Sequence, residues 1–298
     1  MRNTKASITE PAENIVCILA PNPSPMTFKG TNTYIIDNGE LAIIDPGPLN
    51  EEHFNNILEV TAGRSVKYIF LTHSHVDHSP LAKQLSVELN TPIYGYGASD
   101  TGLSSTMLSL LDSGYHSGSE GIDYEFNPDY LIKNDEKFYL NNKTISAIHT
   151  PGHMGNHVCF QYGKVLFSGD HVMGWATSMV SPPYGDLTQF MASCRSLKTK
   201  EFDLFLPGHG DPVESPRERL NFLINHRLER ESQIKEAIKK TALTALEITE
   251  IVYTDVDNSL IPAATRNVFA HLIDLSERGL VEFHGEISEK SKASLKFK

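Results

Sequence analysis

The segment THSHVDHS, at residues 72–79, constrains this chain more than any other part of its sequence. It places three imidazoles and one carboxylate within six positions, a density that ordinary packing does not explain. Imidazole and carboxylate groups together suit Zn²⁺, and also iron or manganese. The metal-capable residues of the segment are His73, His75, Asp77 and His78.

Three further metal-capable residues stand in glycine-containing turns later in the chain. His153 lies in TPGHMGNH, Asp170 in FSGDH and His209 in LPGHGD. Glycine permits the tight backbone turns that aim such side chains inward. We therefore expect two metal ions that share Asp170 as a bridging carboxylate. The first site is expected to contain His73, His75 and His153, and the second Asp77, His78 and His209.

Other residues near these motifs have more than one interpretation. Asp45, in IIDPGP, belongs to a strong turn signal, but a buried carboxylate that holds a ligand imidazole is an equal alternative. His157 and His171 lie close to expected ligands, so a supporting or substrate-binding role is open for both. The other histidines are expected to be solvent or packing residues, namely His53, His116, His149, His226, His271 and His284.

The composition bounds the class of protein and its surroundings. A net charge of −11 gives no overall basic footprint of the kind that nucleic-acid binders show. The three cysteines (Cys17, Cys159 and Cys194) form no CxxC pair, which predicts free thiols in a reducing cytoplasm. No apolar run reaches the ~18 residues that a membrane span requires. The first 14 residues also lack the apolar core of a signal peptide.

The apolar pattern predicts an α/β domain over residues 1–215 and a smaller unit over residues 216–298. In the first part, short β runs alternate with helical patterns, and the metal motif directly follows a buried strand at 66–71. Loops after strands are where α/β sheets place their chemistry. In the second part, a long charged helix at 217–240, two shorter helices and a hairpin indicate a winged helix.

Residues 100–130 are less regular than the rest of the first domain. They mix a short apolar stretch with serine and glycine, and we interpret them as a loop or lid insertion near the metal site. Elsewhere the pattern gives definite elements. Strands are expected at residues 33–36, 41–44, 137–140, 144–149, 157–162, 165–167 and 203–206, and helices at 51–60, 81–89, 187–197, 244–253 and 263–278.

Over roughly residues 15–215, these motifs resemble the metallo-β-lactamase superfamily. The resemblance implies a four-layered αββα sandwich and the two metal sites given above, with Asp45 matching an early acidic motif of the family. It implies a hydrolase with two Zn²⁺, with iron or manganese as alternatives, in which a metal-bridging hydroxide attacks the substrate. The catalytic roles then fall to Asp170, which bridges the ions, and to Asp77, which holds the second ion and relays a proton.

The residue at position 170 narrows the branch of that family. An aspartate there resembles the thioester and phosphodiester hydrolases, whereas true β-lactamases usually carry Cys or Ser, so antibiotic hydrolysis is disfavoured. GTNTYII (30–36), TPGH with the following His157, and NHRLERESQI resemble a group with a C-terminal winged helix. Members of that group are described as endoribonucleases of single-stranded RNA, and relatives as thioesterases. Hydroxyacylglutathione hydrolase shares the ligands, but Ser79-Pro80 replaces its usual Gly-Gly.

The substrate classes that remain predict different surroundings for the metal site. An ester or thioester predicts a compact apolar pocket rimmed by Trp175, Met179 and Tyr184. Single-stranded RNA predicts an open groove towards the winged helix, with cations such as Arg227 and Arg230. A nucleic-acid-binding regulator is a third hypothesis, which the nearly balanced charge of the C-terminal unit weakens. The winged helix would serve equally well as the contact of a homodimer, and no membrane partner is expected.

Overall fold

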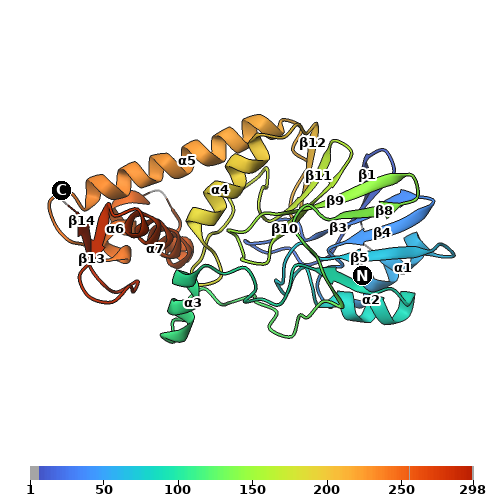
Figure 1. Cartoon of the computed structure of the whole chain (residues 1–298), viewed down its shortest axis with the longest axis horizontal. Helices are drawn as coiled ribbons and strands as arrows, with labels where there is room; N and C mark the ends of the chain where they lie inside the picture. The colour runs from blue at the N-terminus through green and yellow to red at the C-terminus, as the bar shows by residue number, and fades with distance from the viewer. Residues whose placement is uncertain (1–6, 255, 297–298) are drawn as a thin grey trace.

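The computed structural model describes residues 7–254 and 256–296. Two β-sheets lie face to face, helices cover their outer faces, and a mostly helical unit extends from one end (Figure 1). This is the αββα sandwich with a C-terminal winged helix that the sequence predicted. Within the described residues, no helix is long and apolar enough to cross a membrane.

The first sheet has seven strands in sequence order and changes direction in its middle. Its first four strands are antiparallel, and the pairs from the fourth strand to the seventh are parallel. Parallel neighbouring strands end at the same edge of the sheet. Ile44 at the end of one strand lies opposite Phe70 at the end of the next, so Asp45 and Thr72, which follow them, lie side by side. The strands are β1 (Ile8–Ala12), β2 (Ile15–Leu19), β3 (Asn32–Asn38), β4 (Glu40–Ile44), β5 (Val66–Phe70), β6 (Ile93–Gly95) and β7 (Tyr130–Leu131).

The second sheet has five strands in the order β12-β11-β10-β9-β8. Only β11 and β12 are parallel, with Phe167 opposite Leu206, so the loops carrying Asp170 and His209 leave the sheet together. The other pairs are antiparallel. The strands are β8 (Lys137–Leu140), β9 (Lys143–His149), β10 (Val158–Tyr162), β11 (Val165–Gly169) and β12 (Leu204–Pro207).

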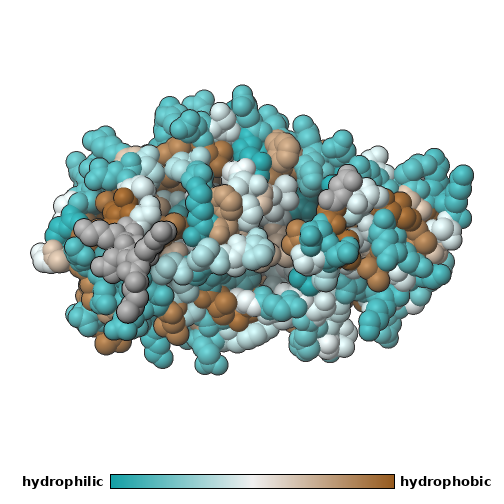
Figure 2. Space-filling model, turned by 180° about the vertical axis from the view of Figure 1, so that it is seen from behind, coloured by the Kyte–Doolittle hydropathy of each residue, from teal (hydrophilic) through white to brown (hydrophobic). Residues whose placement is uncertain are grey.

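Apolar side chains from the two sheets meet in one buried layer that includes Phe70, Phe160 and Phe167. Helices α1 (Glu51–Thr61) and α2 (Leu81–Leu89) cover the outer face of the first sheet, where Ile57 and Leu85 pack. Helix α4 (Leu187–Lys198) covers the second sheet in the same way. Seen from behind, the surface is mostly hydrophilic, with apolar side chains in scattered patches (Figure 2).

The C-terminal unit begins with helix α5 (Pro216–Ala237), which runs from the sandwich to the winged helix (Figure 1). Its Leu220 and Leu223 pack with α4, whereas its Ile234 lies in the core of the winged helix. The helix therefore belongs to both cores, and a boundary at 215/216 stays a prediction. The winged helix contains α6 (Ala245–Val252), the 3₁₀ turn Asn258–Leu260, α7 (Ile261–Glu277), β13 (Val281–Phe283) and β14 (Ala293–Leu295).

The structure corrects the interpretation of residues 100–130 as a loop insertion. Residues Ser105–Asp112 form helix α3, which begins at the side-chain cap of Ser104. Its Met107 and Leu110 are buried in the core of the winged helix, so this part of the segment connects the two units. Residues 119–123 do lie near the metal motif, because the Val76 N–H donates to the Gly121 carbonyl at 2.8 Å and the Asp123 N–H donates to the Ser74 carbonyl at 2.9 Å. The three cysteines are free and buried.

The aromatic layer between the sheets predicts a large effect of one truncation. Phe160 is fully buried, with its ring centroid 4.7 Å from that of Phe70. Phe160→Ala is expected to lower the free energy of unfolding by about 3–5 kcal/mol in urea denaturation. The matched control is Tyr139→Ala, at an exposed position of β8, with an expected change within about 0.5 kcal/mol. Equal losses in the two variants would contradict this account of the core.

Candidate metal centre

The structure brings all seven predicted ligands together at one edge of the sandwich. They come from the loops after β5, β9, β11 and β12, where strands of both sheets end. The ligands form two adjacent groups in which the potential donor atoms of each group lie within 4.8 Å of one another. One group is His73, His75, His153 and Asp170, and the other is Asp77, His78 and His209.

In the first group, three imidazole nitrogens converge on a common space. His75 Nδ1 lies 2.9 Å from His73 Nε2 and 3.1 Å from His153 Nε2. Donors on a tetrahedral zinc ion lie about 3.3 Å apart, because each Zn–N bond is ~2.0 Å long. The three nitrogens are thus spaced as one ion requires.

The second group has similar spacing, and Asp170 lies between the two. Asp77 Oδ2 is 3.0 Å from His209 Nε2, which is 3.3 Å from His78 Nε2. Asp170 Oδ2 is 3.3 Å from His209 Nε2 and 3.7 Å from His153 Nε2, a ligand of the other group. One carboxylate therefore faces both groups, as a bridging ligand must.

Hydrogen bonds behind the ligands determine which ring nitrogen is free. The Nδ1–H groups of His153 and His209 donate to the carbonyl oxygens of Met179 (2.8 Å) and Gly30 (3.1 Å). Because a carbonyl can only accept, each Nδ1 carries a proton, and each Nε2 is the nitrogen that faces the common space. These carbonyls could not be found from the sequence, since a backbone group leaves no residue signature.

Asp45 accounts for the tautomers of two more ligands. Its carboxylate accepts hydrogen bonds from Thr72 N and Thr72 Oγ1, both at 2.7 Å, and from His78 Nδ1 at 2.9 Å. Thr72 Oγ1 in turn accepts from His73 Nδ1 at 2.9 Å. Asp45 also has a positive φ of 52°, so both interpretations of this residue hold: it makes the turn and it holds ligand imidazoles.

Two features of the protein show that this space is built for a cation. Asp170 Oδ1 is buried and has no hydrogen-bond partner among the described residues, an arrangement that is costly unless an ion is bound. Gly208 also has no room for a side chain, because a Cβ there would lie 2.5 Å from Asp170 Oδ1. The donors are imidazoles and carboxylates only, a set that suits zinc, iron or manganese.

Charges within the cluster shift its pKa values in two directions. Burial lowers the pKa of His75 to about 3 and holds the pKa values of His73 and His153 below the usual range, so these rings are neutral ligands. Burial also opposes the charged form of His209, but Asp170 outweighs it and raises the His209 pKa to about 10. For Asp170 itself, burial raises the pKa, and His209 and His78 more than reverse this, so the carboxylate stays ionised.

Other predicted residues lie where their chemistry suggested, with some corrections. His157 and His171 are buried behind the ligands, with the His157 ring centroid 5.2 Å from that of His73. His53, expected to be a packing residue, is buried against Thr33. The prediction that Tyr184 lies at the rim of the site is wrong, because its side chain is buried with Met154 and Ile122.

The prediction of Arg227 as part of an open groove is also wrong. Its side chain is only 3% exposed and lies at the junction of α5, α7 and the segment after Asp170. Arg230 is half-buried, with its guanidinium 4.4 Å from the ring centroid of Tyr253. These two charged side chains are not fully exposed, because backbone carbonyls accept their hydrogen bonds and the Tyr253 ring packs against Arg230.

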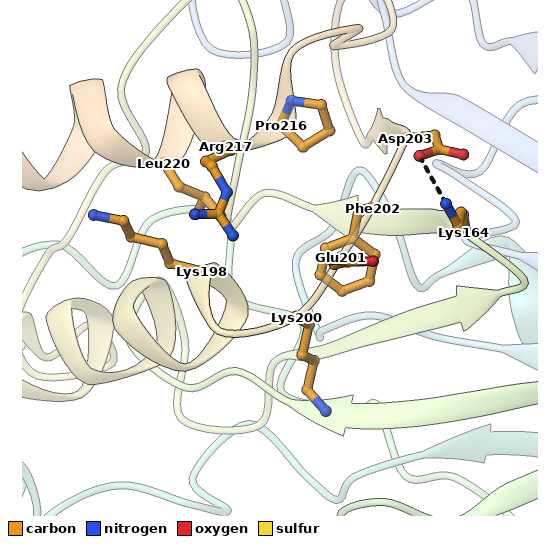
Figure 3. Close-up of a pocket in the computed structure, with 9 residues that line it drawn as sticks. All are labelled: Lys164, Lys198, Lys200, Glu201, Phe202, Asp203, Pro216, Arg217 and Leu220. Atoms are coloured by element: carbon orange, nitrogen blue, oxygen red, sulfur yellow. Dashed lines mark ion pairs between the residues drawn. The ribbon is translucent and has the colours of Figure 1, made fainter.

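A separate surface hollow of about 370 Å³ lies far from the metal centre. It is found where β12 begins, whereas His209 follows the other end of the same strand. Lys198 of α4 and Arg217 of α5 both line it, and Lys164 pairs with Asp203 at 3.5 Å (Figure 3). Among the described residues that line this hollow there is no metal-ligand cluster, so the metal centre is the candidate functional site.

Comparison with known proteins agrees with this geometry. The sequence profile of the metallo-beta-lactamase superfamily matches residues 26–209. The chain belongs to this superfamily. A second profile, the beta-lactamase associated winged helix domain, matches residues 244–290. As a metallo-beta-lactamase superfamily protein, the chain is a metal-dependent hydrolase, and the two ligand groups are where its divalent metals would bind.

Individual relatives match most of this metallo-beta-lactamase superfamily chain. The Beta-lactamase-like protein 2 homolog of Drosophila melanogaster is 29% identical, over 92% of this chain and 91% of the relative. An atrochrysone carboxyl ACP thioesterase of Paecilomyces divaricatus is 28% identical, over 90% and 82%. A beta-lactamase domain protein from Burkholderia ambifaria has the same fold, with a TM-score of 0.80 and 20% identity over 99% and 95% of the two chains.

The contacts of Asp45 predict a defect in metal binding without unfolding. Asp45→Asn keeps the size of the side chain but can accept fewer hydrogen bonds, so His73 and His78 lose their fixed orientation. Zinc affinity, measured by competition with a chromogenic chelator, is expected to fall about 10–100-fold. Asp37→Asn, at a half-exposed carboxylate in β3, is the matched control and should bind zinc normally. Equal affinity in the two variants would contradict the role of Asp45.

Proposed function

We propose that this protein is a dinuclear zinc thioesterase that hydrolyses acyl thioesters with apolar acyl groups. The observation that carries the proposal is a stacked aromatic pair beside the metal centre. The rings of Phe28 and Trp175 lie 4.9 Å apart and are 41% and 37% exposed. Trp175 packs on Gly210, next to His209, and Phe28 is in the segment whose Gly30 carbonyl holds His209.

The ligand roles follow from the positions of the donors. His73, His75 and His153 would hold one zinc ion, Asp77, His78 and His209 the other, and Asp170 would contact both. Zinc bound at such a site lowers the pKa of a water molecule towards 7 and polarises a carbonyl oxygen. Asp77 is the most exposed of the carboxylates here, so it is placed to accept a proton from the attacking water.

The surroundings of the site favour a substrate with an acyl chain over a polyanion. Val76, between two ligands in sequence, is 46% exposed and adds apolar surface at the opening. The neighbouring segment 117–125 carries three acidic residues and no Lys or Arg. Lys29 beside Phe28 is paired with Asp211 at 3.0 Å. Phosphate groups of RNA would meet net negative charge here, which opposes binding.

The relatives support the same choice of substrate. Proteins named atrochrysone carboxyl ACP thioesterase match this chain over most of its length, and their name describes cleavage of an acyl thioester. The hypothesis of a single-stranded RNA substrate required an open groove that includes Arg227, but the Arg227 side chain is buried. We therefore propose a thioester in place of RNA, ahead of a glutathione thioester or a regulatory role in nucleic-acid binding.

A direct assay separates these substrates. Zinc-loaded protein is expected to hydrolyse a medium-chain acyl thioester, with release of thiol followed by a chromogenic disulfide reagent. Asp170→Ala should reduce the rate at least about 10³-fold, because no other group would join the two ions. Single-stranded RNA is expected to stay intact. RNA cleavage that is lost in Asp170→Ala, with no thiol release by the parent protein, would refute the thioesterase proposal.

The aromatic pair predicts a dependence on the length of the acyl group. Trp175→Ala removes apolar surface that an acyl chain contacts, so KM for a long-chain thioester is expected to rise about tenfold, with kcat nearly unchanged. An acetyl thioester should show little change. The matched control is Tyr139→Ala, at an exposed aromatic position in the second sheet. A fall in kcat for all chain lengths would contradict a role of Trp175 in binding.

A further inference from the structure

Helix α5 of the C-terminal unit directs two arginines at the segment that follows Asp170. Arg219 donates from Nε to the carbonyl of Met173 at 2.6 Å and from its terminal nitrogen to that of Ala176. Arg227, two helical turns further on, donates to the carbonyl of Ser178. Three carbonyls of one short segment therefore accept hydrogen bonds from the same helix, which runs from the sandwich to the winged helix (Figure 1).

Arg227 is also fixed from a second helix of the C-terminal unit. Its other terminal nitrogen donates to Asn267 Oδ1 on α7 at 2.9 Å, and the same oxygen accepts from the backbone N–H of Val180 at 3.4 Å. Its guanidinium lies 5.4 Å from the ring centroid of Phe190 on α4. Arg227 and Asn267 thus enclose residues 178–180 from two sides.

The burial of Arg227 indicates that this arrangement has a specific role. Among the residues that the structure describes, no carboxylate forms an ion pair with it. A buried guanidinium without a counter-charge is costly, and the positively charged form is opposed here because burial lowers the pKa of Arg227. A leucine or methionine would fill the same space at a lower cost. An apolar residue at this position would lose the hydrogen bond to the Ser178 carbonyl.

The segment that Arg227 holds contains the outer partner of a metal ligand. The carbonyl of Met179, between Ser178 and Val180, accepts the Nδ1–H of His153 at 2.8 Å. If this carbonyl turns away, the His153 ring loses both its orientation and the proton position that frees Nε2. The path from the winged-helix side to the metal centre therefore has three steps: Arg227 and Asn267, the peptide groups of 178–180, and His153.

We infer that Arg227 is a positioning residue that couples the C-terminal unit to the metal centre by fixing the Met179 carbonyl behind His153. The inference rests on the proposed role of His153 as a ligand. It does not depend on which substrate is hydrolysed. It gives the winged helix a function in building the active site, in place of one in nucleic-acid binding.

The test measures zinc binding and the His153 proton, both without substrate. In Arg227→Met, zinc affinity by chelator competition is expected to fall about tenfold. In the metal-free protein, the His153 Nδ1–H signal in long-range ¹H–¹⁵N spectra, assigned by its absence in His153→Gln, should broaden through faster exchange with water. Because neither measurement uses a substrate, a missing thioesterase activity would not affect the result.

Arg230→Met is the matched control, since Arg230 lies one turn along the same helix and contacts Val252 and Tyr253 instead of the segment. It is expected to keep zinc affinity within about twofold and to keep the sharp His153 signal. If Arg227→Met does not fold, Arg227→Lys replaces it, because lysine keeps the charge but cannot hold Ser178 and Asn267 together. Arg227 variants that lose thermal stability yet bind zinc normally and keep the His153 signal would overturn the inference.

Discussion

The metal centre depends first on the carboxylate of Asp45. Parallel pairing of β4 and β5 brings Asp45 beside Thr72, and the three hydrogen bonds that it accepts there orient His73 and His78 at once. A carboxylate so fully occupied is rigid, and it passes that rigidity to ligands in both metal groups. The turn with positive φ at Asp45 belongs to the same arrangement, because it directs the side chain under the metal motif.

The sandwich supplies the other half of the geometry. Strands of both sheets end at one edge, so loops from distant parts of the sequence meet there, and Asp170 lies between the two ligand groups. The C-terminal unit is not a separate appendage in this arrangement. Its helix α5 packs on α4 and holds the segment after Asp170, and α3 packs in the winged-helix core. The two units thus share the structure that surrounds the site.

The sequence predicted which side chains the fold brings together at one place, because metal sites need particular side chains at particular spacings. It also predicted the two-unit fold, through the alternation of strands and helices before residue 216. It could not decide between the two roles of Asp45, because both need an aspartate after a strand. It missed the carbonyls of Gly30 and Met179, which any residue could provide, and it misplaced Arg227, because only tertiary contacts show which charged side chains are buried.

The central claim is that seven side chains hold two ions joined by Asp170. Anomalous diffraction at the zinc edge, from crystals of zinc-loaded protein, tests it most directly. The account predicts two zinc peaks, one among His73, His75 and His153 and the other among Asp77, His78 and His209, with a carboxylate oxygen of Asp170 at bonding distance from each. A single peak, or two peaks of which one lies beyond the reach of Asp170, would contradict it.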